Sequence, residues 1–271
     1  MPELPEVETT CRGITPYIKG KRVVSLTIRH FGLRWPIPNN MPELMENHCL
    51  IEVSRRGKYI LLRFNHGTAL IHLGMSGSIR ILDAQTEPAK HDHFDIEFSH
   101  GKYLRFNDPR RFGAFLWAGV EPLKHKLLEN LGVEPLDDDF HADYLYKASR
   151  NRKVAIKQFI MDAKLVVGVG NIYANEALFQ AGIRPTRPAN QISHKRYQRF
   201  VSIIKEVLSK AIERGGTTLK NFNQVDGKPG YFAQQLAVYG RTGEPCIQCG
   251  ETLTEIRQTG RSSVFCKQCQ N

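Results

Sequence analysis

The sequence predicts an α+β protein of two domains, in which an antiparallel β-sandwich with an N-terminal helix precedes a helical domain and a cysteine-rich ribbon. Three observations lead to this fold class. Short alternating runs fill the first half of the chain, helical periods begin near residue 140, and four cysteines crowd the last 26 residues. A chain of 271 residues suits two domains of ordinary size. The expected segments are 1–134, 135–236 and 237–271.

The first half begins with an expected helix over residues 5–19, since Pro5 suits the first helical position. The apolar residues of this segment fall on one helical face: Val7, Cys11, Ile14 and Ile18. Seven short runs follow, with Gly, Asn, Pro and Asp between them: VVSLTI, KYILLRF, TALIHL, SIRIL, FDIEF, KYLRF and GAFLWA. This spacing is typical of hairpins and predicts an antiparallel sandwich or barrel that ends near residues 131–140.

The second half changes to helical periods. Helices are expected over residues 154–166, 171–182 and 194–216. In the second helix, Asn171 suits the N-cap and Gly182 suits the C-terminal stop. The polar, glycine-containing segment 217–232 predicts a loop.

The charge of the chain points to a polyanionic partner. The formal net charge is +11 and the isoelectric point is about 9.4, which favours nucleic acid first and a membrane surface second. A basic enzyme without such a partner is the alternative. No apolar run approaches the 18 residues of a membrane span, and the acidic, proline-rich start is unlike a secretory signal. We therefore expect a cytosolic protein.

The last four cysteines form a C-x2-C-x16-C-x2-C pattern, which lets four thiolates close a tetrahedral shell around one structural zinc ion. These ligands are Cys246, Cys249, Cys266 and Cys269. Two disulfides conflict with a reducing compartment, and a redox pair does not explain two knuckles at this spacing. Cys11 and Cys49 stand alone, and we expect both to be buried packing residues.

Cationic and glycine-rich segments surround the predicted helices. A two-stranded ribbon with a turn at Gly260 places Arg261 where it can reach a phosphate, or leaves it as a solvated surface residue. Segment 147–164 carries six Lys or Arg residues against one acid. Gly168 and Gly170 precede the helix at Asn171, so backbone N–H groups can approach an anion. Together these features favour a DNA-docking arrangement.

Three stretches of the β-rich half carry chemistry-bearing residues: SRRGKYI with Lys58 at the head of a strand, HLGMSG with Met75, and KHDHFD followed by NDPRRFG. In the last, Arg110 and Phe112 combine a phosphate-binding fork with a stacking ring. A metal site on His91, Asp92, His93 and Asp95 lacks a supporting ligand motif. On the residues alone, Met75 reads as ordinary core.

The first eight residues, MPELPEVE, place a proline and carboxylates at the start of the chain. Removal of Met1 would make Pro2 a secondary amine with a pKa of about 8, against about 10.4 for lysine, so more of it is nucleophilic at neutral pH. Such an amine can form an iminium with a sugar and promote β-elimination of a phosphate. Glu3 and Glu6 are then placed to donate a proton and to position the sugar. An acidic first helical turn is the alternative reading.

The motifs in their order resemble the formamidopyrimidine-DNA glycosylase family along almost the whole chain. They are PELPEVET, SRRGKY, HLGMSG, KHDH, DPRRFG, VGVGNIYANE, GGTTLK with DGKPGYF, VYGRTGEPC and the two zinc knuckles. The resemblance implies excision of oxidised purines, chiefly 8-oxoguanine and formamidopyrimidines, from duplex DNA, followed by β- and δ-elimination at the abasic site. It also implies that the helical domain is a helix-two-turn-helix.

The resemblance assigns catalytic roles. Pro2 matches the Schiff-base nucleophile, Glu3 the general acid, and Glu6 the carboxylate that engages the opened deoxyribose. Lys58 matches a catalytic lysine that donates a proton during elimination. Arg261 matches the zinc-ribbon arginine that binds the lesion phosphates and donates the δ-elimination proton.

The resemblance also assigns DNA contacts. His91, Arg110 and Arg152 fall on DNA-contacting positions, and the family accepts Lys or Arg at the last. Lys157 and Asn171 match phosphate contacts, the latter in the helix-two-turn-helix.

A wedge that fills the gap left by an extruded base is implied on Met75, Arg110 and Phe112, and this reverses the core reading of Met75. Segment 217–232 matches the loop over the flipped base. Arg110 can bond to the orphaned cytosine. The rivals are an endonuclease VIII-like enzyme for oxidised pyrimidines, which usually begins PEGPE where this chain has PELPE, and a non-enzymatic zinc-ribbon DNA-binding protein. We expect a monomer that acts on damaged duplex DNA in the cytoplasm, at the nucleoid, without a membrane.

Overall fold

The computed structural model describes residues 2–216 and 236–271. The chain divides into two compact units. The N-terminal unit comprises Met1–Asn130 and Arg214–Tyr231, and the C-terminal unit comprises Leu131–Glu213 and Phe232–Asn271. The expected loop 217–232 and Met1 lie outside the described residues.

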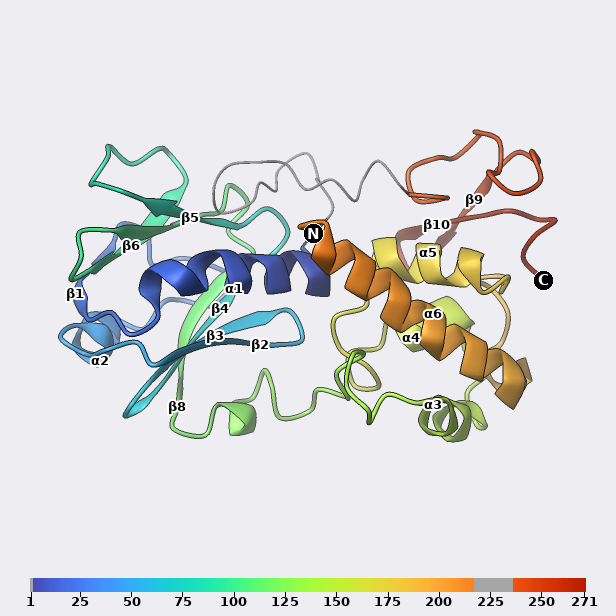
Figure 1. The fold of residues 1–271 in the computed structure, drawn as a ribbon, viewed down its shortest axis with the longest axis horizontal. Helices are drawn as coiled ribbons and strands as arrows, with labels where there is room; N and C mark the ends of the chain where they lie inside the picture. Colours follow the sequence, from blue (N-terminus) through green and yellow to red (C-terminus); the bar gives the residue numbers. More distant parts are fainter. Residues whose placement is uncertain (1, 217–235) are drawn as a thin grey trace. The chain divides into compact units, whose positions relative to one another are not determined.

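Two four-stranded antiparallel sheets build the N-terminal unit (Figure 1). One sheet has the order β1 (Val23–Ile28), β6 (Asp92–Phe98), β7 (Tyr103–Asn107), β5 (Ser78–Leu82). The other has the order β2 (Glu52–Arg56), β3 (Tyr59–Phe64), β4 (Gly67–His72), β8 (Ala114–Gly119). The predicted sandwich is confirmed, and all seven predicted runs are strands whose ends shift by two residues at most.

The strand that the sequence analysis missed is β2. Its residues, EVSRR, are mostly polar, and every one of them is only half-buried, so the strand lacks an alternating apolar signal. It pairs along its whole length with β3, from Glu52 opposite Arg63 to Arg56 opposite Tyr59. Lys58 therefore lies in the turn between β2 and β3, one residue before the strand it was expected to head.

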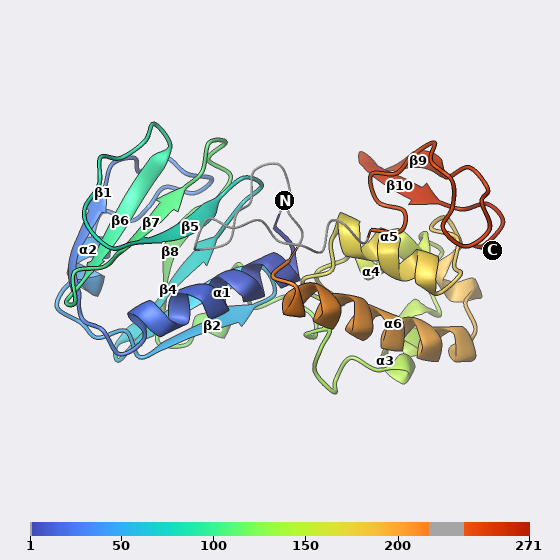
Figure 2. The same ribbon diagram turned by 45° about the horizontal axis from the view of Figure 1, so that its top comes forward.

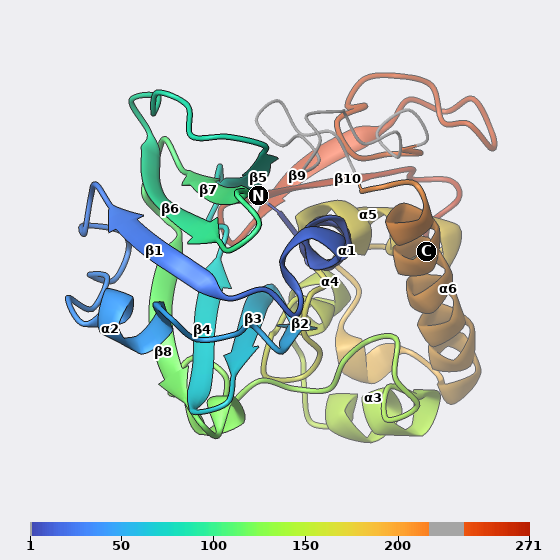
Figure 3. The same cartoon turned by 60° about the vertical axis from the view of Figure 1, so that its left-hand side comes forward.

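Helix α1 (Leu4–Ile18) lies over the strands of this unit (Figure 3) and confirms the expected N-terminal helix. Its apolar face joins both sheets in one buried core, in which Ile14 and Ile18 are fully buried. Cys11 is buried in the same core, and burial raises the pKa of its thiol to about 12, so it remains protonated. The expectation for Cys49 was wrong: it is exposed, on a connecting segment where it pairs only through a bridge to Arg22. A short helix, α2 (Met41–Met45), completes the core.

The C-terminal unit consists of helices followed by a two-stranded ribbon (Figure 2). The helices are α3 (Ala142–Ser149), α4 (Ile156–Ile160), α5 (Asn171–Gln180) and α6 (His194–Glu213). The ribbon strands, β9 (Thr254–Gln258) and β10 (Arg261–Phe265), form the predicted hairpin, and β10 packs on α5. Short 3-10 turns lie at Pro122–Lys124 in the N-terminal unit and at Ala189–Gln191 in this one. In the described part of the chain, no helix has the length and apolar character to cross a membrane.

Two helix predictions need correction. The helix expected over residues 154–166 ends at Ile160, because the segment after it pairs with another part of the chain: the Val133 N–H donates to the Leu165 carbonyl, and Val133 forms a parallel bridge with Val166. Pairing with a distant segment has overridden the local helical period. The N-cap of α5 is Gly170, so Asn171 is the first helical residue and its side chain is available for other contacts. Gly182 does terminate that helix region, with a φ of 65° that favours glycine.

Candidate functional site: a buried N-terminal turn, two loops with exposed tips, and a zinc-ribbon cradle

The first turn of α1 buries the residues that open the chain. Pro2 is buried, Glu3 is 2% exposed, and Glu6 is fully buried. The backbone N–H of Glu3 donates to Oε2 of Glu6 at 2.8 Å, which is the arrangement of a capping box. Gly216, with a φ of 80°, lies so close that a Cβ there would come within 3.3 Å of Glu6. The predicted trio is thus brought together in one buried turn, which the backbone of Gly216 approaches too closely to leave room for a larger side chain there.

Lys58 lies in a cationic neighbourhood with His72 and Arg34. Burial, and then the positive charges of Lys58 and Arg34, lower the pKa of His72 to about 4. His72 is therefore neutral at physiological pH, and its Nδ1 accepts a hydrogen bond from the Gly74 N–H at 2.9 Å. His72 is the first residue of the motif HLGMSG, but no role was predicted for it, because its burial and its charged neighbours are not visible in the sequence.

Two loops of the N-terminal unit carry the proposed wedge: the 75-loop, residues 73–77, and the 110-loop, residues 108–113. Met75 is 41% exposed and Phe112 is 46% exposed, although the neighbours of both are mostly buried or part of tight turns. The guanidinium of Arg110 lies 5.6 Å from the centroid of the Phe112 ring. The core reading of Met75 is not supported, since its side chain is exposed.

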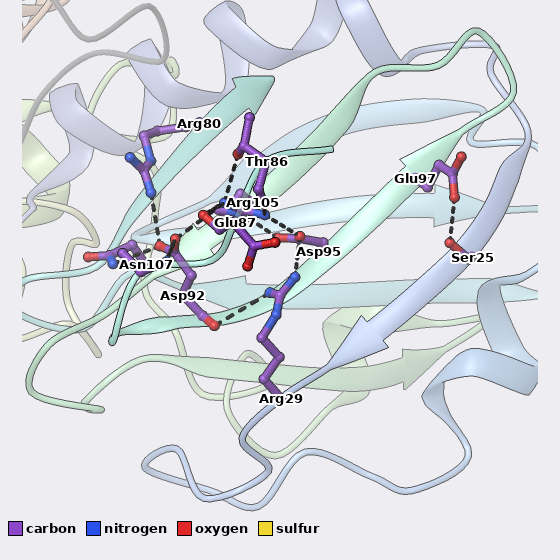
Figure 4. Close-up of polar contacts among 11 residues, drawn as sticks. Ser25, Arg29, Arg80, Thr86, Glu87, Asp92, Asp95, Glu97, Arg105 and Asn107 are labelled. Atoms are coloured by element: carbon purple, nitrogen blue, oxygen red, sulfur yellow. Dashed lines mark hydrogen bonds and ion pairs between the residues drawn. The ribbon is translucent and has the colours of Figure 1, made fainter. Parts of the chain in front are cut away.

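A buried ionic cluster, drawn in Figure 4, holds Thr86 and Glu87 in the loop that precedes His91 in the chain. Arg105, 2% exposed, makes two parallel bonds to Asp95 at 2.8 and 2.7 Å and donates to the carbonyl groups of Thr86 and Glu87. Burial alone would raise the pKa of Asp95, but hydrogen bonds from Arg105 and Arg29 outweigh it and hold that pKa below its usual value. The cluster thereby fixes the segment that leads to His91.

The same cluster removes the metal-site reading of this stretch. Asp92 bonds to Arg80 at 2.9 Å and Asp95 to Arg105, while His93 Nε2 lies 2.7 Å from the carbonyl oxygen of Asp108. These oxygen and nitrogen atoms, which would have to ligate a metal ion, are engaged in contacts within the protein. In residues 2–216 and 236–271, the four C-terminal cysteines are the one group of three or more His, Cys, Asp or Glu side chains that could hold a metal ion.

In the C-terminal unit, three predicted DNA contacts meet at the ribbon. Lys157 is 2% exposed, and its Nζ donates to the carbonyl of Ser262 and to Oγ of Ser263, the latter at 2.7 Å. Asn171 Nδ2 lies 3.4 Å from Ser262 Oγ, and its buried Oδ1 has no hydrogen-bond partner among the described residues. Arg261 is exposed and, together with Lys157, lines a pocket of about 120 Å³.

The hydrogen bonds of Arg152 join it to residues outside the ribbon. Its side chain is exposed in the turn after α3, and its backbone bonds to Ser149 and Asn190. Asn175 of α5, which was not among the predicted site residues, holds strand β10. Its Oδ1 accepts from the Val264 N–H at 3.0 Å, and its Nδ2 lies 3.4 Å from the Ser262 carbonyl. Asn175 follows Asn171 by one helical turn, and that spacing was the available signal.

The four ribbon cysteines fit a zinc ion. All their Sγ atoms lie within 4.8 Å of one another, and two of the pairs are 3.9 and 3.5 Å apart. Zn–S bonds of about 2.3 Å in a tetrahedron require sulfurs about 3.8 Å apart. The N–H groups of Gln248 and Cys269 point at ligand sulfurs at 3.4 Å, which stabilises thiolates. Four protein ligands leave no open position, so the zinc is structural.

Three family models match the chain in sequence order. They are the formamidopyrimidine-DNA glycosylase N-terminal domain over residues 1–115, the formamidopyrimidine-DNA glycosylase H2TH domain over residues 131–223, and a zinc finger found in FPG and IleRS over residues 243–271. The chain belongs to the formamidopyrimidine-DNA glycosylase family. This membership confirms the resemblance, the α+β fold class and the structural zinc predicted from the sequence.

Full-length relatives agree. The chain is 56% identical over 270 residues to the formamidopyrimidine-DNA glycosylase of Idiomarina loihiensis, and the match covers 100% of both. It is similar to the crystal structure of MutM (Fpg) from Thermus thermophilus, with a TM-score of 0.89 and 37% identity over 99% of this chain and 98% of that one. The Lactococcus lactis Fpg, solved in a complex with DNA that contains an abasic site, gives a TM-score of 0.92 and 30% identity over 99% of each chain.

Proposed function

We propose that this protein is a base-excision repair enzyme that removes oxidised purines, 8-oxoguanine and formamidopyrimidines, from duplex DNA and then cleaves the abasic site by β,δ-elimination. The observation that carries this function is the buried turn that holds Pro2, Glu3 and Glu6 together, in a chain of this family. A buried carboxylate pair beside a terminal secondary amine is suited to proton transfer and amine addition at a sugar carbon.

The chemistry begins once Met1 has been removed and the nitrogen of Pro2 is an amine. That nitrogen adds to C1′ of the damaged nucleotide, and the bond from C1′ to the base breaks, so the base leaves with the electron pair and takes up a proton. Glu3 protonates the sugar ring oxygen as the ring opens, and Glu6 holds the opened deoxyribose through its carboxylate. The resulting iminium makes the C2′ proton acidic, and loss of that proton expels the 3′ phosphate; a second elimination expels the 5′ phosphate.

Lys58 and Arg261 serve the elimination steps as proton donors. The ammonium of Lys58 acts electrostatically on His72, whose Nδ1 accepts from Gly74 in the 75-loop, and this supports a place for Lys58 beside the proposed wedge. Met75, Arg110 and Phe112 occupy the space of the extruded base, which is consistent with their exposed tips.

Lys157 and Asn171 bind backbone phosphates, and Arg152 and His91 contact the DNA. The Nδ2 donor of Asn171, which lies 3.4 Å from Ser262 Oγ, and the buried ammonium of Lys157 support a phosphate site at the ribbon. Segments 1–134, 135–236 and 237–271 would act as catalytic, helix-two-turn-helix and zinc-ribbon parts. The protein would work as a monomer in the cytoplasm, at the nucleoid, without a membrane partner, in keeping with a net charge of +11.

The test is covalent trapping. Borohydride reduces the iminium, so the processed protein should form a stable adduct with a duplex that carries 8-oxoguanine opposite cytosine. Pro2→Gly should lower both excision and strand cleavage by roughly a hundredfold, since it replaces the rigid secondary amine that both steps share with a primary amine on a flexible backbone. Glu3→Gln should lower base excision by roughly 10²–10⁴-fold and leave trapping on a preformed abasic site largely intact.

The lesion panel includes an oxidised pyrimidine, because that substrate separates this function from the endonuclease VIII-like alternative. An active preparation that gives no adduct with any lesion would sink the mechanism, and full activity in Pro2→Gly would do the same. A preparation that binds duplex DNA but processes no lesion would favour the non-enzymatic alternative.

A further inference from the structure

The 75-loop and the 110-loop share one buried carboxylate. Asp108 is fully buried at the start of the 110-loop. Its Oδ1 accepts a hydrogen bond from the hydroxyl of Ser76 at 2.8 Å, and its Oδ2 accepts one from the N–H of Gly113 at 2.7 Å. The side chain therefore bonds the residue that follows Met75 and the residue that follows Phe112.

The rest of Asp108 is equally engaged. Its Oδ1 also accepts from the N–H of Arg110 at 3.3 Å, and its carbonyl accepts from the N–H of Arg111 at 3.2 Å. Its own N–H donates to the carbonyl of His91 at 3.0 Å, and its carbonyl oxygen lies 2.7 Å from His93 Nε2. A single residue thus connects the 75-loop, the 110-loop and the start of β6.

The two loops also touch through their backbones. Gly74 has a φ of 64°, and a Cβ at this position would come within 2.5 Å of the backbone nitrogen of Gly113. A Cβ on Gly113 would in turn meet Asp108 Oδ2 at 3.0 Å and the carbonyl of His72 at 2.8 Å. No side chain fits between these segments, so their spacing is set by backbone contact and held by the carboxylate.

The exposed tips contribute little to this arrangement. Met75 and Phe112 are 41% and 46% exposed, whereas Ser76, Asp108 and Gly113 are buried. Side chains that enter a base stack must arrive together at a defined spacing, because each recovers stacking only if the others keep the gap open. The positions of Met75 and Phe112 must therefore be set by the buried residues next to them in the two loops.

We propose that Asp108 is a positioning residue that sets the spacing of Met75, Arg110 and Phe112, so that the three side chains enter the duplex as one unit and Arg110 meets the base opposite the lesion. This inference rests on the proposed function, since it takes these three side chains as the wedge. It adds a residue that touches neither the DNA nor the reacting atoms.

The variant Asp108→Asn tests the proposal with almost no change of shape. One oxygen becomes an NH₂ group, which must face the N–H of Arg110 in one orientation of the amide or the N–H of Gly113 in the other. Two donors then oppose each other at the root of the 110-loop in either case. The hydroxyl of Ser76 can rotate to accept, so the 75-loop keeps its link.

The readout is single-turnover excision of 8-oxoguanine opposite cytosine and opposite adenine. Asp108→Asn should lower excision opposite cytosine by roughly tenfold to a hundredfold, because a displacement of about 1 Å is costly in a positioned site. The ratio of the two rates should move toward one, since Arg110 no longer reads the opposite base. Borohydride trapping on a single-stranded oligonucleotide with an abasic site, which needs no wedge, should stay unchanged.

Two variants complete the experiment. Asp95→Asn is the matched control, because Asp95 is another buried carboxylate of the N-terminal unit, and it bonds Arg29 and Arg105 and neither loop. It should leave the cytosine-to-adenine ratio as it is in the unmodified protein, whatever it does to stability. Ser76→Ala frees the 75-loop alone and should lower excision opposite both bases by a similar factor.

An unchanged ratio in Asp108→Asn, or the same change in Asp95→Asn, overturns the proposal. If Asp108→Asn does not fold, Ser76→Ala decides, and full excision by that variant opposite both bases overturns it. Failure of the proposed function looks different, because the unmodified protein would then neither excise nor be trapped.

Discussion

In the N-terminal unit, the side chains proposed to enter the duplex are exposed and lie above buried residues, whereas in the C-terminal unit one of the side chains proposed to bind phosphate, Lys157, is itself buried. Met75 and Phe112 are 41% and 46% exposed above the buried carboxylate of Asp108. Lys157 is 2% exposed and donates to two oxygens of the ribbon, those of Ser262 and Ser263.

The difference follows from what each region must meet. A wedge has to project into a base stack, so burial is impossible for its tips, and hydrogen bonds at the root must supply its rigidity. A phosphate group comes to the protein surface, so its cation can be held in place by the fold before DNA arrives. The first arrangement depends on one carboxylate, and the second depends on the ribbon and hence on the zinc that folds it.

Zinc removal should have the largest effect, and it should destabilise the C-terminal unit while leaving the N-terminal unit folded. Chelation unfolds the ribbon that carries Arg261, Ser262 and Ser263, so we expect duplex affinity to fall by about two orders of magnitude as phosphate contacts are lost together. Both tryptophans, Trp35 and Trp117, lie in the N-terminal unit, so the unfolding transition seen by their fluorescence should barely move. Zinc release is followed with a chromogenic chelator, and full duplex affinity in the chelated protein would contradict the dependence on the ribbon.

Arg261→Ala should have a smaller effect on DNA binding than zinc removal has, in addition to any effect on the elimination step. The slope of log affinity against log salt should fall by about 1, as expected for the loss of one phosphate contact. Arg257→Ala is the matched control, because it removes the same charge from the same ribbon, and the pairing of Arg257 with Ser262 and of Arg261 with Gln258 places the two arginines on opposite faces. Equal changes of slope in both variants would reduce Arg261 to a general contribution of charge.

His72→Asn should have the smallest effect, confined to the acid stability of the N-terminal unit. The pKa of His72 is lowered to about 4 by burial and by the charges of Lys58 and Arg34, from an ordinary value of about 6.5. The unfolded chain therefore takes up this proton as the pH falls through 6.5, whereas the folded chain does so only near 4. The stabilisation is fully present above pH 6.5 and is lost between those two values.

Asparagine keeps an acceptor at the place of Nδ1, which receives the Gly74 N–H, and removes the titration. Urea unfolding followed by tryptophan fluorescence at pH 7 and pH 5 should show a smaller loss of stability in the variant than in the unmodified protein. An equal loss in both would assign the acid sensitivity to other groups.

Much of the fold was predictable because its signals are local. The run VVSLTI is β1 to the residue, and the period over residues 5–19 is α1 within one residue at each end. The failures share a physical cause. Strand β2 has a polar sequence and exists through its pairing with β3, and the helix expected over residues 154–166 stops at Ile160 because the segment after it pairs with Val133. Neither contact is visible in a short window of sequence.

The candidate site likewise contains features that local sequence predicts and features that depend on contacts between distant segments. The motif PELPE places Pro2, Glu3 and Glu6 within one turn, so their proximity is a property of the sequence. Membership of the family was likewise predictable, because its motifs occur in order along the chain. The supporting roles were not predictable: Asp108, His72 and Asn175 fall within quoted motifs, but their hydrogen-bond partners were not visible in the sequence.

The sequence by itself determined the zinc ribbon and the reactive start of the chain, because ligand spacing and chain order are covalent properties. Only the tertiary structure decided that Lys157 is bonded to Ser262, 105 positions along the chain, and that Ser76 and Gly113 meet on one carboxylate. Such contacts come from the packing of distant segments, where a buried charge is stable only if the fold brings its hydrogen-bond partners to it.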